Sequence, residues 1–419
     1  MINFKTDFKD SVFYKNILIL SKGTVLAQII PFIISPFITR LYSPKQLGVL
    51  ALFSSISVIL GSIVNGRYEQ ALLLVKTENE AKHLTILSLL ISLVLSVILF
   101  LFFIFFQSHL LDFFNEPDLT FWIYLIPLVV FSIGAFNTLN YYELRKKNFK
   151  KIANSEIYRS TSFAAIQLSF PLLKSGLFGL MIGKIISSLI APFYLWKISK
   201  FEIGKVNTSL LLILAKRFID FPKYTNFSIL LNNLSVNAIN LLIPVLYSTS
   251  LLGLYSLMYK VLAAPFAFLG NTINQVFLED AVRQKNELGQ VYKLTKRMVI
   301  QLTLVSVIFF GTAYFIVEDL FAFVFGEDWR MSGVYAEYLI PFFMFKFIAS
   351  PLTSIHTAFE KQKLSFTLQL IMFVLSIGSL LYAYLNLWIF EHYLLLFSVL
   401  MSIFYIYRVL IILKIAKTN

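Results

Sequence analysis

The stretch KGTVLAQIIPFIISPFITRLYSPKQLGVLALF, residues 22–53, decides the fold class of this chain. It contains a long apolar run, a short polar turn and the start of a second apolar run, which ends at NGRYEQ, residues 65–70. Each run is about as long as the roughly 20 residues that an α-helix needs to cross a bilayer. The stretch therefore predicts a membrane hairpin of two helices.

The rest of the chain has the same composition as this hairpin. Of its 419 residues, 58% are hydrophobic and 14% are charged, and the mean hydropathy is +0.78. A soluble protein of this size could not cover so much apolar surface. The apolar runs are too long for the alternating segments of a membrane barrel, and helices satisfy their own backbone groups in lipid. The sequence predicts an all-α polytopic membrane protein.

Twelve membrane spans are expected. They fall at residues 16–38, 46–66, 83–106, 119–141, 152–173, 175–196, 225–247, 251–272, 298–317, 334–356, 364–386 and 391–413. The fifth of these has the weakest hydropathy, but the charge pattern requires it. The predicted organisation is an N-terminal six-helix bundle at 1–200, a cytoplasmic connecting loop at 201–224 and a C-terminal six-helix bundle at 225–419.

The positive charges support this count and set the orientation. Most of the 36 Lys and Arg residues lie in alternate loops and at the two ends of the chain. The opposite set of loops holds only Arg40, Lys45, Lys174 and Arg330. Because short cytoplasmic loops collect Lys and Arg, both termini are predicted to be cytoplasmic. The net charge of +14 then reflects topology and not nucleic-acid binding.

The loops and motifs argue against an enzyme. No predicted loop is long enough to fold as a catalytic domain, and no phosphate-binding glycine motif is present. The four histidines (His83, His109, His356 and His392) are scattered and lack the spacing of a metal site. We expect no catalytic residues, no metal and no cofactor.

An internal repeat relates the two predicted bundles. LYSPKQLGVLAL (Leu41–Leu52) aligns with LYSTSLLGLYSL (Leu246–Leu257), with half of the positions identical. Upstream, Gln28 and Ser35 align with Asn233 and Asn240; downstream, after a four-residue slip, Gly61 and Asn65 align with Gly270 and Asn274. The repeat predicts two parallel six-helix halves around a central cavity, an architecture that transporters use.

Polar side chains interrupt several predicted spans. On the seventh span the asparagines fall on one helical face: Asn226, Asn233, Asn237 and Asn240. The first and fifth spans carry similar stripes. Such amides either join helices by hydrogen bonds or face a water-filled lumen that meets sugar hydroxyls. Their number favours the lumen for Gln28, Ser35, Asn233, Asn237, Asn240 and Gln167.

Cations also lie inside the predicted spans. Lys22 and Arg159 can snorkel to the cytoplasmic side, and Glu156 is placed to neutralise Arg159. Lys184, Lys260 and Lys346 fall near mid-span, where a cation costs about 2.5–3.5 kcal/mol. Because these three lack an evident partner, we expect a shared aqueous cavity that binds an anionic cargo. Its predicted cationic residues are Lys184, Lys260, Lys346, Arg159 and Lys22.

Several motifs, taken in order, resemble a known family. They are residues 27–53 of the opening stretch, NGRYEQALLL (65–74), DFPKY (220–224), GLYSL (253–257), NQVFLEDA (274–281) and SPLTSIHTAFEKQ (350–362). Their order and spacing resemble polysaccharide flippases of the O-antigen and capsule kind, within the multidrug/oligosaccharidyl-lipid/polysaccharide exporter superfamily.

The resemblance implies alternating access between two bundles in the cell inner membrane. The implied cargo is an undecaprenyl-diphosphate-linked oligosaccharide, moved to the outer leaflet for O-antigen, capsule or other lipopolysaccharide biosynthesis. The implied partners are membrane lipids, a polysaccharide polymerase and a chain-length regulator. Three matched residues, Arg67, Tyr68 and Glu69, are expected either at a cytoplasmic gate or in a structural turn.

Two other functions compete with this one. A multidrug or cation antiporter of the same fold would use several membrane carboxylates, whereas the predicted spans hold Glu156 and Glu337. A polymerase or membrane glycosyltransferase would need a large outer loop with catalytic groups, which the predicted topology lacks. The sequence favours the flippase.

Overall fold

The computed structural model describes residues 23, 25–170, 176–199, 206–288 and 291–417. Within these ranges the chain is helical and contains no β-strand. Nine of the described helical segments are long and apolar enough to cross a membrane, and Val25–Leu41 is a shorter apolar helix. The predicted polytopic all-α fold is confirmed.

The chain divides into two compact units, which we describe separately. Unit 1 comprises Met1–Tyr42 and Val49–Asn237, and unit 2 comprises Ser43–Gly48 and Ala238–Asn419. The limit between the units lies within α10 (Asn226–Leu246). The predicted connecting loop at 201–224 contains α9 (Thr208–Arg217), which packs on α5 (Glu78–Phe114) in unit 1.

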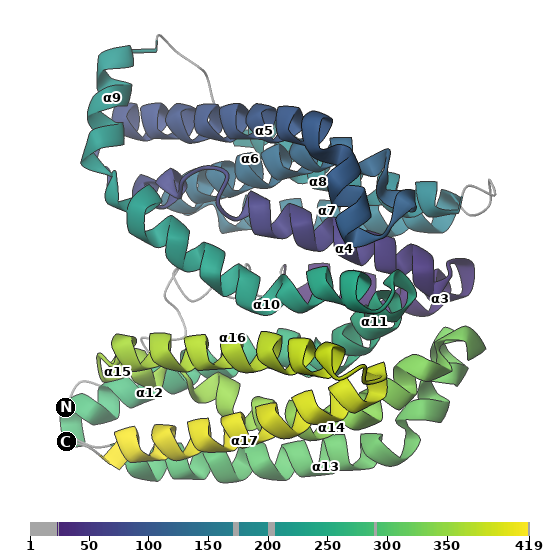
Figure 1. The fold of residues 1–419 in the computed structure, drawn as a ribbon. Helices are drawn as coiled ribbons and strands as arrows, with labels where there is room; N and C mark the ends of the chain where they lie inside the picture. Colours follow the sequence, from purple (N-terminus) through teal and green to yellow (C-terminus); the bar gives the residue numbers. More distant parts are fainter. Residues whose placement is uncertain (1–22, 24, 171–175, 200–205, 289–290, 418–419) are drawn as a thin grey trace. The chain divides into compact units, whose positions relative to one another are not determined.

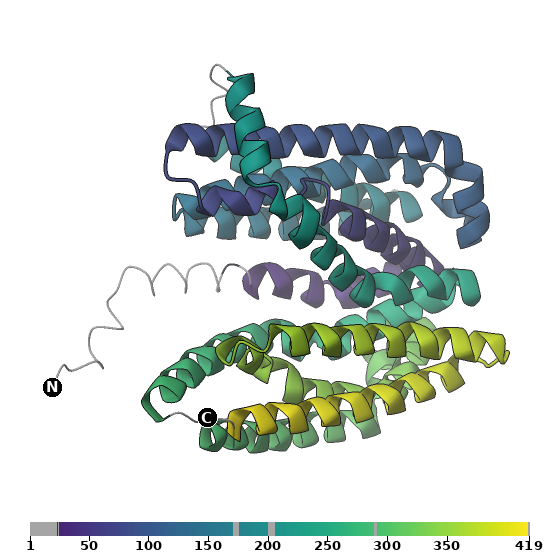
Figure 2. The ribbon, with the colours of Figure 1, turned by 60° about the vertical axis from the view of Figure 1, so that its left-hand side comes forward.

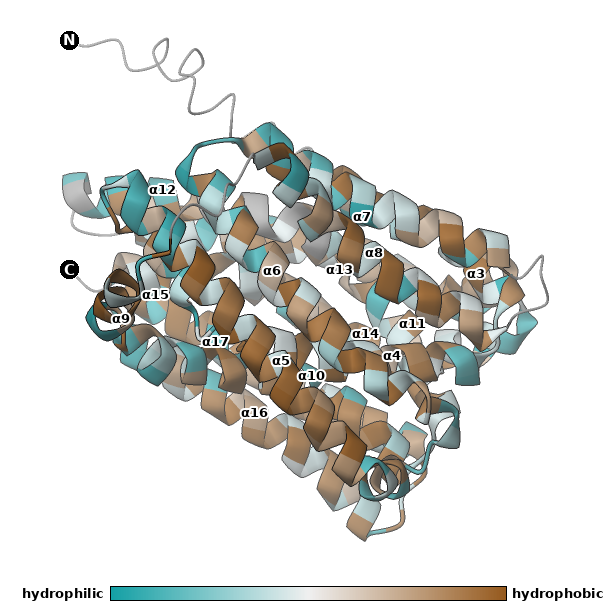
Figure 3. Cartoon of the chain, turned by 90° about the horizontal axis from the view of Figure 1, so that it is seen from above, coloured by the Kyte–Doolittle hydropathy of each residue, from teal (hydrophilic) through white to brown (hydrophobic). Residues whose placement is uncertain are grey.

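Unit 1 is built around α6 (Ile126–Arg145), the most buried of its apolar helices. α6 packs against α5, α8 (Leu177–Ser199) and the 3₁₀ turn η1 (Tyr68–Leu73), while α7 (Phe149–Ser169) pairs with α8 (Figure 1). α3 (Ser35–Leu41) and α4 (Pro44–Gly61) precede them. α5 is coloured hydrophobic along most of its length in Figure 3, and many of its apolar side chains are exposed, as expected of a surface that faces lipid.

Unit 2 is built around α14 (Arg330–Ala349), which packs against α11 (Thr249–Pro265), α13 (Tyr292–Phe325) and α17 (Phe390–Lys417). α16 (Gln362–Leu385) lies beside α17, drawn in yellow in Figure 2. The unit is completed by the π-helical turn η6 (Phe266–Gly270), α12 (Asn271–Leu288), the 3₁₀ turn η8 (Ser350–Leu352) and α15 (Ile355–Ala358).

The longest helices extend well beyond the predicted spans. α5 starts at a capping box, in which Thr77 and Glu80 satisfy each other's backbone N–H groups, and it ends at Asn115 in a left-handed conformation. α13 likewise continues to Gly326 (φ 104°). Hydropathy marks only the part of a helix that matches the bilayer, whereas the caps decide where the helix ends. α7, the predicted fifth span, is a continuous helix despite its polar content.

The repeated turns pack on each other within unit 2. A Cβ atom on Gly48 would lie 1.9 Å from the Thr249 carbonyl oxygen, and a Cβ on Gly253 would lie 1.8 Å from that of Pro44. Pro44 and Thr249 are equivalent in the repeat, and so are the two glycines. The contact is therefore reciprocal, as at a local two-fold axis. The conserved spacing within the repeat has a steric cause: both glycines allow backbone to touch backbone.

Candidate functional site

The NGRYEQ motif forms a tight turn after α4 in unit 1. Gly66 and Arg67 both adopt left-handed backbone conformations, with φ values of 59° and 61°. Asn65 anchors the turn because its side-chain amide donates to the Gly134 carbonyl (3.0 Å) and to Thr138 Oγ1 (3.1 Å) of α6. A positive φ is unusual for arginine. The turn is thus held in a strained shape that sets where Arg67 points.

Arg67 forms an ion pair with Glu69 inside this turn. Arg67 Nη1 lies 3.2 Å from Glu69 Oε1, and the side chains are 13% and 0% exposed. Burial raises the pKa of the Glu69 carboxyl above its ordinary value, and the charge of Arg67 counters this shift. Glu69 Oε2 and Arg67 Nε are buried without a hydrogen-bond partner in the described part of the chain. One acceptor and one donor of this buried pair are therefore still able to form a hydrogen bond.

Tyr68 connects this turn to the segment that leads into α10. Its hydroxyl donates to the Ala215 carbonyl of α9 (3.0 Å), and its ring packs in a cluster with Phe218 and Tyr142. The DFPKY motif follows α9 as the π-helical turn η5 (Phe221–Thr225), which contacts η1. The predicted gate residues thus lie together, and two motifs far apart in sequence meet at one place in unit 1.

A second charged cluster lies on α7 and α8. Arg159 and Glu156 form the predicted ion pair, which is confirmed. The Arg159 guanidinium also lies 5.2 Å from the centre of the Phe136 ring, and Lys184 lies on α8, the helix that pairs with α7. This pair of helices therefore carries two cations and one acidic partner, Glu156, which leaves an excess positive charge.

Gln167, a predicted lumen residue, is buried in the contact between α7 and α8. Its side chain is 2% exposed and donates to the Leu180 carbonyl (3.4 Å), while its backbone carbonyl accepts the Tyr42 hydroxyl (2.8 Å). Of the two roles left open for the amides, the structure favours helix packing for this one.

Lys346 lies in an aromatic cage within unit 2. Its ammonium donates to the Tyr259 hydroxyl (2.9 Å) and lies 5.1–5.5 Å from the centres of four rings, those of Tyr259, Phe266, Phe342 and Phe343. Each such contact contributes about 0.5–1 kcal/mol, and more when desolvated. The expectation that this lysine lacks a partner is wrong, because the four rings and the Tyr259 hydroxyl stabilise its charge.

Part of the cage around Lys346 is visible in the sequence. Phe342 and Phe343 precede Lys346 by one helical turn, a spacing that places them on the same face of α14. Tyr259 and Phe266 come from α11 and η6, so only the tertiary structure shows them beside Lys346.

The other predicted site residues are not gathered into one group. Lys260 is exposed, as is Gln28, and Lys22 lies outside the described residues. Ser35 is buried, and its hydroxyl donates to the Pro31 carbonyl (2.6 Å) of its own helix. The predicted lumen roles of Gln28 and Ser35 and the predicted cavity roles of Lys260 and Lys22 stay predictions.

The asparagine stripe on α10 forms bonds along its own helix. The Asn233 amide donates to the Ile229 carbonyl (3.1 Å), and the Asn237 amide donates to the Asn233 carbonyl (3.0 Å). Asn233, Asn237 and Asn240 are all half-buried. The bonds of Asn233 and Asn237 do not join helices, so the lumen role of this stripe stays a prediction.

Asn65 and Asn274, equivalent in the repeat, make equivalent bonds. Asn65 donates to α6, and the Asn274 amide donates to the Pro351 carbonyl (2.9 Å) of η8, directly after α14. α6 and α14 contain the fourth predicted span of each half. The two units therefore share a polar anchor as well as a sequence motif.

A family model described as "Polysaccharide biosynthesis protein" matches residues 37–333. The chain belongs to this family. The match covers more than half of the chain and includes the Arg67–Glu69 turn and the η5 motif. No curated protein sequence matches this polysaccharide biosynthesis protein significantly.

Solved structures with a similar fold include a lipid II flippase and multidrug transporters. "Lipid II flippase MurJ, inward closed conformation" aligns with a TM-score of 0.74 at 14% identity, over 95% of this chain and 87% of that chain. An inward-facing multidrug resistance MATE family transporter of the MOP superfamily aligns with a TM-score of 0.61 at 13% identity, over 96% of this chain and 95% of that chain. A mutant of the Vibrio cholerae MATE transporter VcmN aligns with a TM-score of 0.56 at 14% identity, over 96% of this chain and 95% of that chain. At these identities the likeness is one of fold.

Proposed function

We propose that this protein flips a lipid-linked oligosaccharide across the cell inner membrane by alternating access. The observation that supports this most directly is the family match over residues 37–333, which includes four of the motifs. The fold shared with a lipid II flippase fits the same function. The proposed cargo is an undecaprenyl-diphosphate-linked repeat unit for O-antigen, capsule or other lipopolysaccharide.

The charge of the cluster on α7 and α8 fits an anionic cargo. Lys184 and Arg159 outnumber Glu156, and a diphosphate offsets an excess of positive charge at membrane depth. A cation antiporter would instead place unpaired carboxylates there. Lys346 is stabilised by its aromatic cage, so we assign the contact with the diphosphate at membrane depth to Lys184 and Arg159.

The turn at Arg67–Glu69 is the proposed cytoplasmic gate. It packs on η5, where α9 passes into α10, and π-helical turns occur at functional sites of helices. A change in the angle of α10 would therefore act directly on the Arg67–Glu69 pair. We propose cytoplasmic termini, from the distribution of Lys and Arg, and a polymerase and a chain-length regulator as partners.

Deletion and complementation test this function. Loss of the gene is expected to abolish surface polysaccharide and to leave lipid-linked units in the cytoplasmic leaflet. Lys184→Ala should lower the flipping rate about tenfold or more at normal protein level, because a charge contact is lost. Lys150→Ala, at an exposed lysine in the first turn of α7, is the matched control.

Two results would overturn the proposal. Normal surface polysaccharide in the deletion strain would exclude the function. Efflux of cationic dyes that depends on this protein, without an effect on lipid-linked units, would indicate the multidrug antiporter instead.

A further inference from the structure

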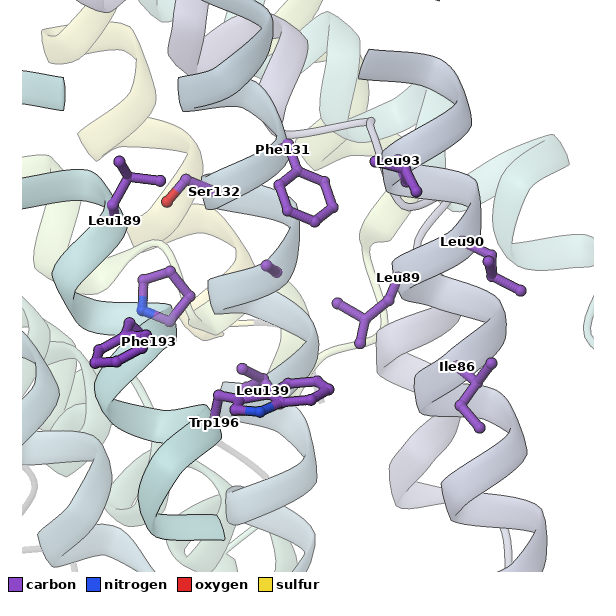
Figure 4. A pocket seen from close by; sticks show the side chains of 12 residues that line it. Ile86, Leu89, Leu90, Leu93, Phe131, Ser132, Leu139, Leu189, Phe193 and Trp196 are labelled. Atoms are coloured by element: carbon purple, nitrogen blue, oxygen red, sulfur yellow. The ribbon is translucent and has the colours of Figure 1, made fainter. Parts of the chain in front are cut away.

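An apolar groove of about 400 Å³ opens between α5, α6 and α8 in unit 1. Figure 4 shows side chains of all three helices converging on it, with Trp196 and Leu139 toward one end and Leu93 and Phe131 toward the other. Pockets of about 300–1,000 Å³ hold compact ligands. The groove is separate from the Arg67–Glu69 turn and from the cluster of Lys184 and Arg159, since none of those residues lines it.

The groove offers a ligand almost no polar contact. Its walls are aliphatic and aromatic, and Phe193 and Trp196 are 68% and 38% exposed. The one side-chain hydroxyl in the wall, that of Ser132, already donates to the Ser188 carbonyl. A group that enters the groove therefore has to be hydrocarbon, because a polar group would lose its hydrogen bonds with water.

Two lysines extend the walls of the groove at one end. Lys82 precedes Ile86 by one helical turn on α5, and Lys197 follows Phe193 by one helical turn on α8, so each continues a face that lines the groove. Four residues rise about 6 Å along the helix axis. At the same end of α6, Glu143 is buried and pairs with Lys151 (3.3 Å), so its charge is offset. The groove thus runs from an apolar interior to a cationic mouth.

We propose that this groove binds the hydrocarbon chain of a single-chain lipid, with its anionic headgroup at Lys82 and Lys197. One apolar channel with two lysines at its mouth fits one chain that carries a diphosphate, whereas a phospholipid has two chains and one phosphate. The occupant is the polyprenyl carrier of the cargo, and the inference rests on the proposed function. The groove would hold the carrier in the leaflet at the proposed cytoplasmic side.

Photolabelling of the full-length protein in nanodiscs tests the groove. The probe is a photoreactive polyprenyl diphosphate, and labelled peptides are identified by mass spectrometry. Labelling is expected on α5 and α8 beside the groove and should be displaced by unlabelled polyprenyl diphosphate. Lys82→Gln and Lys197→Gln should each weaken labelling about five-fold, since each lysine near a membrane surface contributes about 1 kcal/mol.

A matched pair of substitutions separates the groove from the rest of the lipid-facing surface. Leu93 and Leu101 are both on α5 and both 48% exposed, but only Leu93 lines the groove. Leu93→Trp should fill it and lower labelling about tenfold, and Leu101→Trp should leave labelling unchanged.

The outcomes distinguish this inference from the proposed function. Equal labelling of the two tryptophan variants, or displacement by phosphatidylglycerol as efficient as by polyprenyl diphosphate, would overturn the groove assignment. Flipping measured with the same variants in reconstituted vesicles tests the function by itself. Normal flipping with unspecific labelling would reject only the groove, whereas specific labelling without flipping would reject only the function.

Discussion

Replacing Arg67 with alanine is expected to destabilise the fold by about 3–5 kcal/mol, the usual cost of leaving a buried charge without its partner. The cost is high because the Glu69 side chain is 0% exposed and Arg67 Nη1 lies 3.2 Å from its Oε1. Its Oε2 has no hydrogen-bond partner among the described residues. Alanine would therefore leave both carboxylate oxygens unpaired where solvent does not reach them.

Acidification is expected to restore part of this stability. Burial raises the pKa of the Glu69 carboxyl, and Arg67 counters the shift, so removing Arg67 raises the pKa further. The folded protein then binds the proton more tightly than the unfolded chain, whose glutamate pKa is about 4.3. Stability accordingly falls as the pH rises from that value through the folded pKa. Lowering the pH within this window should stabilise Arg67→Ala more than the wild type.

A double-mutant cycle isolates the charge. Glu69→Gln keeps the shape and removes the charge, so Arg67→Ala should cost only about 1 kcal/mol in that background. The assay is the midpoint of thermal unfolding in detergent for all four proteins at several pH values. The coupling free energy is expected to be about 2–4 kcal/mol. Equal effects of Arg67→Ala in both backgrounds, or a midpoint independent of pH, would refute the reasoning.

A glycine at position 67 separates the backbone from the charge. Arg67 has a φ of 61°, which glycine adopts without steric cost. Arg67→Gly should therefore be about 1 kcal/mol more stable than Arg67→Ala, although both lack the guanidinium.

Three further predictions concern packing. Lys346→Met should lower stability by about 2 kcal/mol by removing the contacts with the aromatic cage; an unchanged unfolding midpoint would indicate that the lysine is solvated. Gly48→Ala should prevent accumulation of folded protein because its Cβ would lie 1.9 Å from the Thr249 carbonyl oxygen. The matched control is Gly378→Ala, whose Cβ would meet nothing within 4 Å and should stabilise the fold by up to about 1 kcal/mol. Asn65→Ala should cost about 1–3 kcal/mol by removing two buried hydrogen bonds to α6. Size-exclusion profiles after heating check the Gly48, Gly378 and Asn65 substitutions against the wild type.

The sequence was enough to predict the contacts of some polar residues within the spans, but not of others. The Glu156–Arg159 pair could be predicted because both partners lie one turn apart on one helix. The cage around Lys346 could not be predicted in full because two of its rings come from other elements. Gln167 shows the same limit, since its partner carbonyl belongs to α8.

The sequence by itself determined the class of the protein, an all-α polytopic membrane protein, and where most of its long apolar helices lie along the chain. The thickness of the bilayer and the need to satisfy backbone groups in lipid act on local composition, so runs of apolar residues are enough to reveal them. The repeat also follows from sequence, because its glycines and asparagines recur at matching positions. Only the tertiary structure decided which side chains meet: the buried Arg67–Glu69 turn on η5, the cage of Lys346, the reciprocal contact of Gly48 and Gly253, and the groove between α5, α6 and α8. Each depends on distances between helices, which local composition does not encode.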